Sequence, residues 1–433
     1  MRIALIAAGA GRMYCGSCLR DDMLARAMRA AGEDVFVIPT YTPLRTESGD
    51  DPDAPIFLGG INVYLQQHSG VFRHTPRWID GLLDYEPLLR AATKNAGDAD
   101  PGALVDLTLS LLEGERGRQK KEIDRLVRFL RDEIRPDIVN LPNALFLGLA
   151  RRMREELGVP IVCSMTGSDV FVDQMKSEDQ ERVKRSIGRR SEQIDAFIAT
   201  SNFYVEYIAE YYGLPREKMH VVPIGIDLTG YESAPLRHEP ERPFTIGFLA
   251  RICQQKGLHV LADAFVALTR QSDAAACRLR VAGYMSRRNR GYLAEIERRL
   301  AAGGCAEQFE YVGEVDRAGK LAFLRSLDVL SVPTTFLEPK GLYVLEAMAA
   351  GVPVVQPAHG SFPELIDATG GGVLVPPDDP EALAGALAGL MNNPARRDEL
   401  AARGSEAVHN LFSAARMAAA TLEIYKQVLA QSK

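Results

Sequence analysis

Residues 333–357 read PTTFLEPKGLYVLEAMAAGVPVVQP and join a loop, a helix and a strand. Two carboxylates stand in this stretch: Glu338 lies in the loop, and Glu346 lies about one turn into a helix expected over residues 342–350. The backbone N–H groups of residues 340–342 begin that helix. Unpaired N–H groups at a helix start, with the helix dipole behind them, bind anions. A carboxylate such as Glu346 accepts hydrogen bonds from a diol such as a ribose. The stretch therefore predicts an anion site at the start of a helix.

Apolar runs of strand length alternate with helical patterns along most of the chain. In the first half the expected strands are residues 2–8, 34–39, 137–141, 160–165, 196–199 and 220–223. In the second half they are residues 244–249, 278–282, 310–312, 329–332, 354–356 and 372–375. Such alternation is typical of parallel sheets covered by helices. The predicted fold class is α/β, with two successive doubly wound units.

A polar stretch with three prolines, residues 227–243, separates the two units and reads as a linker. We place a first domain at residues 1–230, with a mostly helical insertion at about 46–135, and a second domain at residues 231–410. Residues 411–433 are expected to form one amphipathic helix that crosses back to the first domain. Ligands of doubly wound sheets bind at the carboxyl ends of the strands. The expected site is therefore a cleft between two facing domains.

A second motif, GFLARICQQKGL at residues 247–258, follows the first strand of the second unit. Arg251 and Lys256 stand five positions apart in it. A leaving nucleoside diphosphate gains negative charge as its bond to a sugar breaks, and two cations at a strand end stabilise that charge without a metal. Alone, an arginine and a lysine in a loop are usually solvated surface residues. Together with the segment of Glu338 and Glu346 they predict phosphate binding, and we expect no metal and no cofactor beyond the substrate.

The first unit has a glycine-rich loop at residues 9–16. A dinucleotide-binding fingerprint requires glycine at position 14, where Tyr14 stands, so this fingerprint is excluded. Asp21 and Asp22, at the start of the following helix, either orient an acceptor hydroxyl or cap the helix.

Together these motifs resemble the signatures of the family 4 retaining glycosyltransferases, which have the GT-B fold of two facing Rossmann-like domains. Residues 338–355 follow the family pattern EPFGLxxLEAMAxGxPVV, except that Lys340 stands where Phe is usual. Residues 250–257 follow GRxxxxKG with Ala in place of the first Gly. The resembled HGTD motif has Thr166 at the His position, which loses a protonatable group, and PNGVD has Ile224 in place of Asn.

The resemblance implies a role for each matching residue. Arg251, Lys256 and Glu338 are the implied catalytic residues: the two cations hold the pyrophosphate, and Glu338 orients the transferred sugar. The implied donor-binding residues are Gly16, Thr166, Asp169, Lys340, Gly341, Leu342 and Glu346, of which Glu346 contacts the ribose. The implied activity is retaining transfer of a hexose-type sugar from a nucleoside diphosphate sugar to an acceptor, which is a carbohydrate or a lipid-linked molecule.

Two other functions remain open. One is a catalytically inactive nucleotide-sugar-binding protein, for which Thr166 and Ile224 argue. The other is a sugar epimerase or phosphorylase of the same fold.

Composition limits the class of protein. The chain has 433 residues, 51 Lys plus Arg against 57 Asp plus Glu, and 46 % hydrophobic residues, so it is an ordinary globular protein with a net charge of −6. Nucleic acid is not an expected partner. The apolar start reads as a buried strand and not as a signal peptide, and six cysteines without metal spacing fit a cytoplasmic protein. Two basic runs, residues 116–121 and 182–190, are solvated helix faces or a contact with the inner face of a membrane.

Overall fold

The structure, a computed structural model, describes residues 1–9, 16–41, 45–46, 49–50, 57, 101–231, 242–271 and 277–432. The chain divides into two compact units: Met1–Pro223 with Ala414–Lys433 form unit 1, and Ile224–Ser413 form unit 2. Of the insertion expected at residues 46–135, the first described residues lie in a short antiparallel pair, β3 (Arg45–Thr46) and β4 (Gly49–Asp50). From residue 101 onward the insertion is mostly helical.

Unit 1 is built on a six-stranded parallel sheet in the order β2-β1-β5-β6-β7-β8. Its strands are β1 (Arg2–Ala7), β2 (Asp34–Pro39), β5 (Ile138–Leu141), β6 (Ile161–Ser164), β7 (Ala196–Ala199) and β8 (Met219–Val221). Every residue of β5, β6 and β7 is buried. This burial explains their largely apolar sequences, because helices cover both faces of a doubly wound parallel sheet. The two polar residues, Asn140 and Ser164, are hydrogen-bonded to each other at 3.1 Å.

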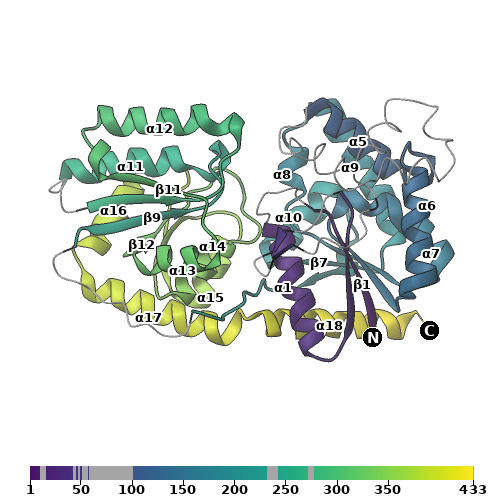
Figure 1. Ribbon diagram of the computed structural model, residues 1–433. Coiled ribbons are helices and arrows are strands. Elements are labelled where there is room, and N and C mark those ends of the chain that lie inside the picture. The colour runs from purple at the N-terminus through teal and green to yellow at the C-terminus, as the bar shows by residue number, and fades with distance from the viewer. Residues whose placement is uncertain are drawn as a thin grey trace. The chain divides into compact units, whose positions relative to one another are not determined.

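The helices of unit 1 include α1 (Gly16–Ala30), α5 (Pro101–Glu113), α6 (Lys120–Phe129), α7 (Ala150–Leu157), α8 (Asp169–Val172), α9 (Ser177–Arg190), α10 (Asn202–Tyr212) and α18 (Ala414–Gln431). The last of these packs on α1 (Figure 1), and Tyr425 on α18 is fully buried. The final helix begins at Ala414 and not at residue 411, because Phe412 leaves helical geometry and Ser413 pairs with Ile226 in an isolated bridge.

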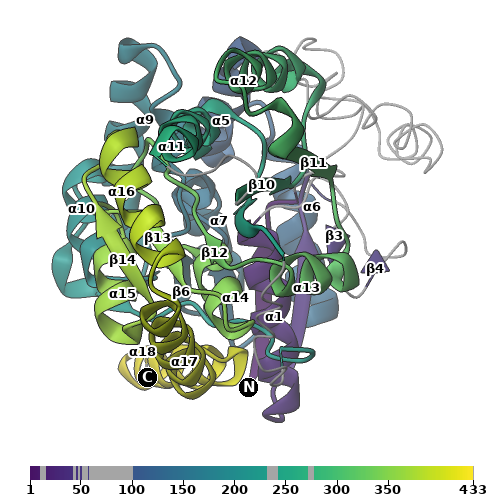
Figure 2. The same cartoon turned by 90° about the vertical axis from the view of Figure 1, so that its left-hand side faces the viewer.

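Unit 2 has a second six-stranded parallel sheet, in the order β11-β10-β9-β12-β13-β14. Its strands are β9 (Phe244–Leu249), β10 (Cys277–Ala282), β11 (Phe309–Gly313), β12 (Val329–Leu330), β13 (Val354–Pro357) and β14 (Gly372–Val375). Its helices are α11 (Leu258–Gln271), α12 (Arg290–Ala302), α13 (Arg317–Arg325), α14 (Leu342–Ala349), α15 (Phe362–Thr369), α16 (Pro380–Met391) and α17 (Pro394–Leu411). Helices α11 and α16 pack against each other beside the sheet (Figure 2).

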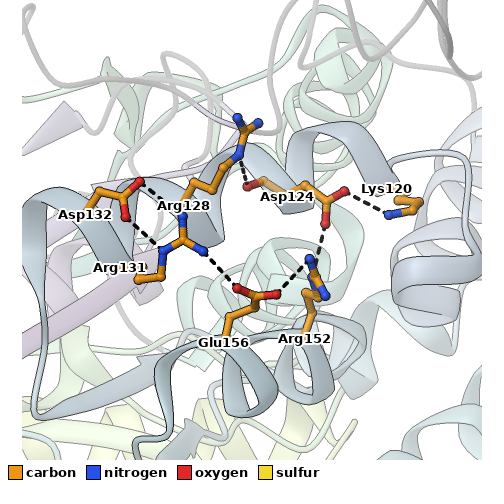
Figure 3. Close-up of polar contacts among 7 residues, drawn as sticks. All are labelled: Lys120, Asp124, Arg128, Arg131, Asp132, Arg152 and Glu156. Atoms are coloured by element: carbon orange, nitrogen blue, oxygen red, sulfur yellow. Dashed lines mark hydrogen bonds and ion pairs between the residues drawn. The ribbon is translucent and has the colours of Figure 1, made fainter.

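A chain of ion pairs on the surface of unit 1 joins α6 to α7 (Figure 3). Arg152 contacts Asp124 at 3.2 Å and Glu156 at 3.0 Å, and Glu156 also contacts Arg131 at 2.9 Å. Arg131 lies in the π-turn Leu130–Ile134 that ends α6. These side chains are partly exposed, so water and salt weaken the attraction within each pair. The network orients the two helices more than it stabilises the unit.

A close backbone contact supplies a tighter constraint in unit 1. Gly148 is buried in the 3-10 segment Ala144–Leu149, and a Cβ atom at this position would lie 1.8 Å from the carbonyl oxygen of Leu111 on α5. No side chain fits there without a shift of backbone, so glycine is required for α5 to pack at this distance.

We expect Gly148→Ala to lower the free energy of unfolding by about 1–3 kcal/mol, the usual cost of overpacking. Gly389→Ala is the matched control, because Gly389 lies exposed inside α16, where a Cβ atom would meet no described atom within 4 Å, and alanine there gains about 0.5–1 kcal/mol of helix propensity. Urea unfolding followed by circular dichroism measures both. Equal effects of the two substitutions would contradict the close contact at Gly148.

Candidate functional site

The loop after β9 carries the two predicted phosphate-binding cations. Arg251 is exposed in this loop, and Lys256 ends the short 3-10 turn Gln254–Lys256. Gly257 follows in the left-handed conformation (φ 73°), and a Cβ atom there would lie 1.7 Å from the carbonyl oxygen of Pro333. The glycine after Lys256 therefore allows the β9 loop to contact the start of the 333–357 segment directly.

This contact brings Lys256 to Glu338. The Lys256 Nζ atom lies 2.5 Å from Glu338 Oε2, and both side chains are largely buried, with 13 % and 4 % of their surface exposed. The backbone of Glu338 is held as well, because its carbonyl oxygen accepts hydrogen bonds from the Ser361 N–H (2.9 Å) and the Ser361 hydroxyl (2.8 Å). Gly360 (φ 60°) leaves room for this approach, since a Cβ atom there would lie 2.6 Å from the Glu338 nitrogen.

The second oxygen of Glu338 binds the start of α14. Its Oε1 atom accepts hydrogen bonds from the N–H groups of Lys340 (3.2 Å) and Gly341 (3.5 Å), and Leu342 is the first residue of the helix. The anion at this helix start is thus the carboxylate of Glu338 itself. The sequence predicts that these N–H groups face a ligand; in the structure two of them bind Glu338, because a short Pro-Lys-Gly turn brings the preceding carboxylate back onto them.

These contacts determine the charge state of Glu338. Burial alone would raise the pKa of this carboxyl group, but the Lys256 ammonium, the charge of Lys340 and the Lys340 N–H lower it, and the resulting pKa is about 2. The Tyr343 hydroxyl also donates to Glu338 Oε2, at 3.3 Å. Burial, together with the charge of Glu338, raises the pKa of Tyr343 well above its usual value, so the phenol keeps its proton.

Glu346 has a lysine partner of its own. Its Oε1 atom lies 2.5 Å from the Nζ atom of Lys320 on α13, and the two side chains are 17 % and 12 % exposed. Lys320 is not predicted from the sequence, because it is 26 positions from Glu346 and belongs to no motif; only the packing of α13 near α14 shows it. Glu338 and Glu346 are therefore each paired with a lysine.

The predicted residues of unit 1 lie around the end of β6. Gly16 is the first residue of α1, and the neighbouring Ser17 hydroxyl donates to the carbonyl oxygen of Thr166 at 3.3 Å. The Thr166 hydroxyl in turn donates to the carbonyl oxygen of Pro142 at 3.1 Å. Helix α1 and the loop after β6 are thus held together in unit 1.

Asp169 is buried, with 2 % of its surface exposed, and accepts a 2.5 Å hydrogen bond from the Tyr204 hydroxyl. The same hydroxyl accepts a hydrogen bond from the Gly167 N–H at 2.9 Å. Asp169 therefore orients Tyr204, and Tyr204 orients the loop that carries Thr166. Asp21, an alternative acceptor-orienting residue, is also buried, 2.8 Å from the Arg20 guanidinium.

Metal and membrane contacts can be judged only for the described residues. No cluster of three or more His, Cys, Asp or Glu side chains suited to a metal ion lies in the part of the chain that the structure describes. In the same part, none of the helices combines the length and the apolar composition that a bilayer crossing requires.

Two family models match this chain, one in each unit. The Glycosyltransferase Family 4 model matches residues 22–229, and the Glycosyl transferases group 1 model matches residues 243–393. The chain is 35 % identical to the phosphatidyl-myo-inositol mannosyltransferase of Mycobacterium leprae over 209 residues, which are 48 % of this chain and 53 % of the relative. The chain spans about half the length of the curated relatives it matches.

Solved structures match the whole chain. Sucrose-phosphate synthase from Thermosynechococcus elongatus has a TM-score of 0.72 at 20 % identity, with 99 % of each chain covered. HepE of Anabaena in complex with UDP has a TM-score of 0.69 at 17 % identity, with 99 % of this chain and 100 % of HepE covered. The likeness shows the GT-B fold with its two Rossmann-like domains, as the sequence motifs predict. Together the two models cover most of the chain, which therefore belongs to the glycosyltransferases that these family 4 and group 1 models describe.

Proposed function

We propose that this protein is a hexosyltransferase that moves a sugar from a nucleoside diphosphate sugar to an acceptor hydroxyl, with retention of configuration at the transferred carbon. The observation that carries the proposal is the buried Lys256–Glu338 pair at the start of α14, next to the loop of Arg251. The UDP complex of the structurally similar HepE and the mannosyltransferase activity named for the Mycobacterium leprae relative support it.

Charge stabilisation is the main catalytic contribution that we assign to unit 2. As the glycosidic bond breaks, negative charge develops on the diphosphate, and the side chains of Arg251 and Lys256 meet this charge directly. Because these cations are built into the protein, the transfer that we propose needs no metal. Lys340 adds a third positive charge, from the loop before α14. Gly341 and Leu342 begin this helix, whose dipole favours negative charge near its N-terminus.

The two carboxylates orient the donor. We assign Glu338 to the hydroxyls of the transferred sugar and Glu346 to the ribose, since ionised carboxylates accept hydrogen bonds from diols. Lys320 bonds Oε1 of Glu346, and we assign the other oxygen, Oε2, to the ribose. Both roles require ionised carboxylates, and the low pKa of Glu338 meets this requirement.

Retention requires the acceptor to attack on the face that the leaving group vacates. We propose that a phosphate oxygen of the departing diphosphate takes the acceptor proton, so that no base from the protein is needed. Thr166 fits this scheme, because its hydroxyl proton is donated to the carbonyl oxygen of Pro142. In unit 1 we assign Gly16 and Thr166 to contacts with the substrates, and Asp169 to the support of the Thr166 loop through Tyr204.

The acceptor is a carbohydrate or a lipid-linked molecule in this proposal. The name of the Mycobacterium leprae relative, a phosphatidyl-myo-inositol mannosyltransferase, favours a lipid-linked one. We accordingly propose that the protein works at the cytoplasmic face of a membrane. The basic residues of α9 would then contact anionic headgroups.

A second candidate, an inactive nucleotide-sugar-binding protein, is favoured by one observation. Thr166 replaces the protonatable residue of the resembled motif, and its hydroxyl is bonded to backbone. Donor hydrolysis without acceptor separates the two candidates, because only a catalytic protein cleaves the donor. A same-fold phosphorylase would carry pyridoxal phosphate on a lysine, and its absorbance spectrum would reveal this.

The donor is tested by a thermal-shift screen with GDP-mannose, UDP-glucose and ADP-glucose. A ligand that binds the folded state stabilises it by mass action, and a hundredfold excess over Kd gives about 2.7 kcal/mol. We expect one of the three to raise Tm and to be slowly hydrolysed to its nucleoside diphosphate, measured by chromatography. If a donor binds but is never cleaved, with or without glycan and phosphoinositide acceptors, the catalytic proposal is wrong.

Lys256→Ala should reduce donor cleavage about 10²–10³-fold, the usual cost of removing one group that stabilises transition-state charge. Lys120→Ala is the control, because Lys120 lies exposed on α6 and pairs with Asp124 at the surface. Rates of nucleoside diphosphate release compare the two variants with the wild type. Full activity of Lys256→Ala would remove the assigned role.

The charge state of Glu338 predicts a pH effect on stability. Its pKa is about 2 in the folded chain against 4.5 for a free carboxyl group, so the ionised form stabilises the fold above about pH 5, and this contribution is lost as the pH falls toward 2. Glu338→Gln should therefore be less stable than the wild type at pH 7, and the difference should shrink at pH 4 and below. Urea midpoints of the wild type and of Glu338→Gln at several pH values measure this difference in stability. A difference that does not change with pH would contradict the prediction.

A further inference from the structure

Lys256 lies between two aromatic rings. Its Nζ atom is 4.9 Å from the ring centroid of Phe336 and 4.9 Å from that of Tyr343. A cation within about 6 Å of an aromatic face is attracted by the ring quadrupole, and the attraction grows when the cation is shielded from water. The resembled family pattern does not specify the residue at position 343.

Tyr343 also bonds the partner of Lys256. Glu338 Oε2 accepts both the Lys256 ammonium, at 2.5 Å, and the Tyr343 hydroxyl, at 3.3 Å. The other oxygen, Oε1, is occupied by backbone N–H groups. Two donors from different elements therefore share one carboxylate oxygen, and Tyr343 contacts the lysine through its ring and the glutamate through its hydroxyl.

In the proposed reaction the donor diphosphate and the Glu338 carboxylate compete for the ammonium group of Lys256. Glu338 is only 3 % exposed, so water cannot replace that ammonium group. A buried carboxylate that loses its cation is strongly destabilised unless other donors satisfy it. The Tyr343 hydroxyl is such a donor, because it stays protonated and is already directed at Oε2.

We propose that Tyr343 is a positioning residue that lets Lys256 pass from Glu338 to the donor diphosphate. Its hydroxyl keeps Glu338 Oε2 bonded when the ammonium turns away, and its ring, with that of Phe336, keeps the ammonium near the site. This inference rests on the proposed function in one respect, that Lys256 binds the diphosphate. Tyr343 would affect nucleotide binding only by positioning Lys256 and Glu338, without contacting the reacting atoms.

Three variants separate the contributions of ring and hydroxyl. Tyr343→Phe removes only the hydroxyl, Tyr343→Leu removes hydroxyl and ring, and Phe336→Leu removes only the second ring. Tyr292→Phe is the control, because the Tyr292 hydroxyl bonds His259 on the neighbouring helix α11 of the same unit and has no place in the proposed site. Calorimetric titration with UDP and with GDP measures Kd, and the nucleotide that binds more tightly is used throughout.

We expect Tyr343→Phe to weaken nucleotide binding about tenfold, the scale of one hydrogen bond to a charged group. Tyr343→Leu should weaken it further, Phe336→Leu should weaken it less than Tyr343→Leu, and Tyr292→Phe should leave it unchanged. The deciding measurement repeats Tyr343→Phe in a Lys256→Met background. There the hydroxyl has no lysine to release, so its removal should change Kd by less than about twofold.

The outcomes distinguish this inference from the proposed function. Two results would overturn the inference alone, provided that Lys256→Met weakens nucleotide binding. In one, Tyr343→Phe leaves Kd unchanged; in the other, Tyr343→Phe weakens binding equally with Lys256 and with Met at position 256. In either case Tyr343 does not act through Lys256. If Lys256→Met leaves Kd unchanged, the phosphate assignment of the proposed function falls, and the inference with it. Thermal unfolding of each variant confirms that it is folded, and the conservative Tyr343→Phe decides the question even if Tyr343→Leu does not fold.

Discussion

The need to keep one buried carboxylate charged organises the candidate site of unit 2. Glu338 has almost no contact with water, so protein groups must satisfy both of its oxygens. Two N–H groups at the start of α14 and two side chains from different elements do so. Gly257 and Gly360 allow this convergence, because a side chain at either position would separate the backbones that meet there. These two glycines therefore let the backbone hold Lys256 and Glu338 together.

Much of the fold could be predicted from the sequence, and the reason is physical. Strands buried on both faces of a parallel sheet are largely apolar, and the run AFIA at residues 196–199 shows this directly. Lys256 and Glu338 could be placed in one site because each lies in a motif with known spacing. Lys320 could not, because its contact with Glu346 depends on how two helices pack. Tyr343 reads as an ordinary buried aromatic residue until its two partners are known.

The start of the last helix illustrates a different limit. Residues 394–431 have a helical composition almost throughout, and sequence periodicity alone does not locate the interruption at Phe412 and Ser413. A tertiary contact decides it, since Ser413 pairs with Ile226. Likewise, the side chain of Asp169 is turned toward Tyr204, a residue 35 positions away. Motif spacing identifies which residues matter, whereas tertiary packing decides whether each contacts a ligand or supports a neighbour.

The division of the chain also has a consequence for its synthesis. Unit 1 is discontinuous: its last helix, α18, is encoded after the whole of unit 2. Domains generally fold as they leave the ribosome, starting from the N-terminus. Here unit 2 is complete in sequence while unit 1 still lacks the helix that buries Tyr425 against α1. The surface of α1 that packs on α18 therefore stays uncovered until the last residues have been translated. Unit 1, whose synthesis begins first, is the unit that completes its fold last.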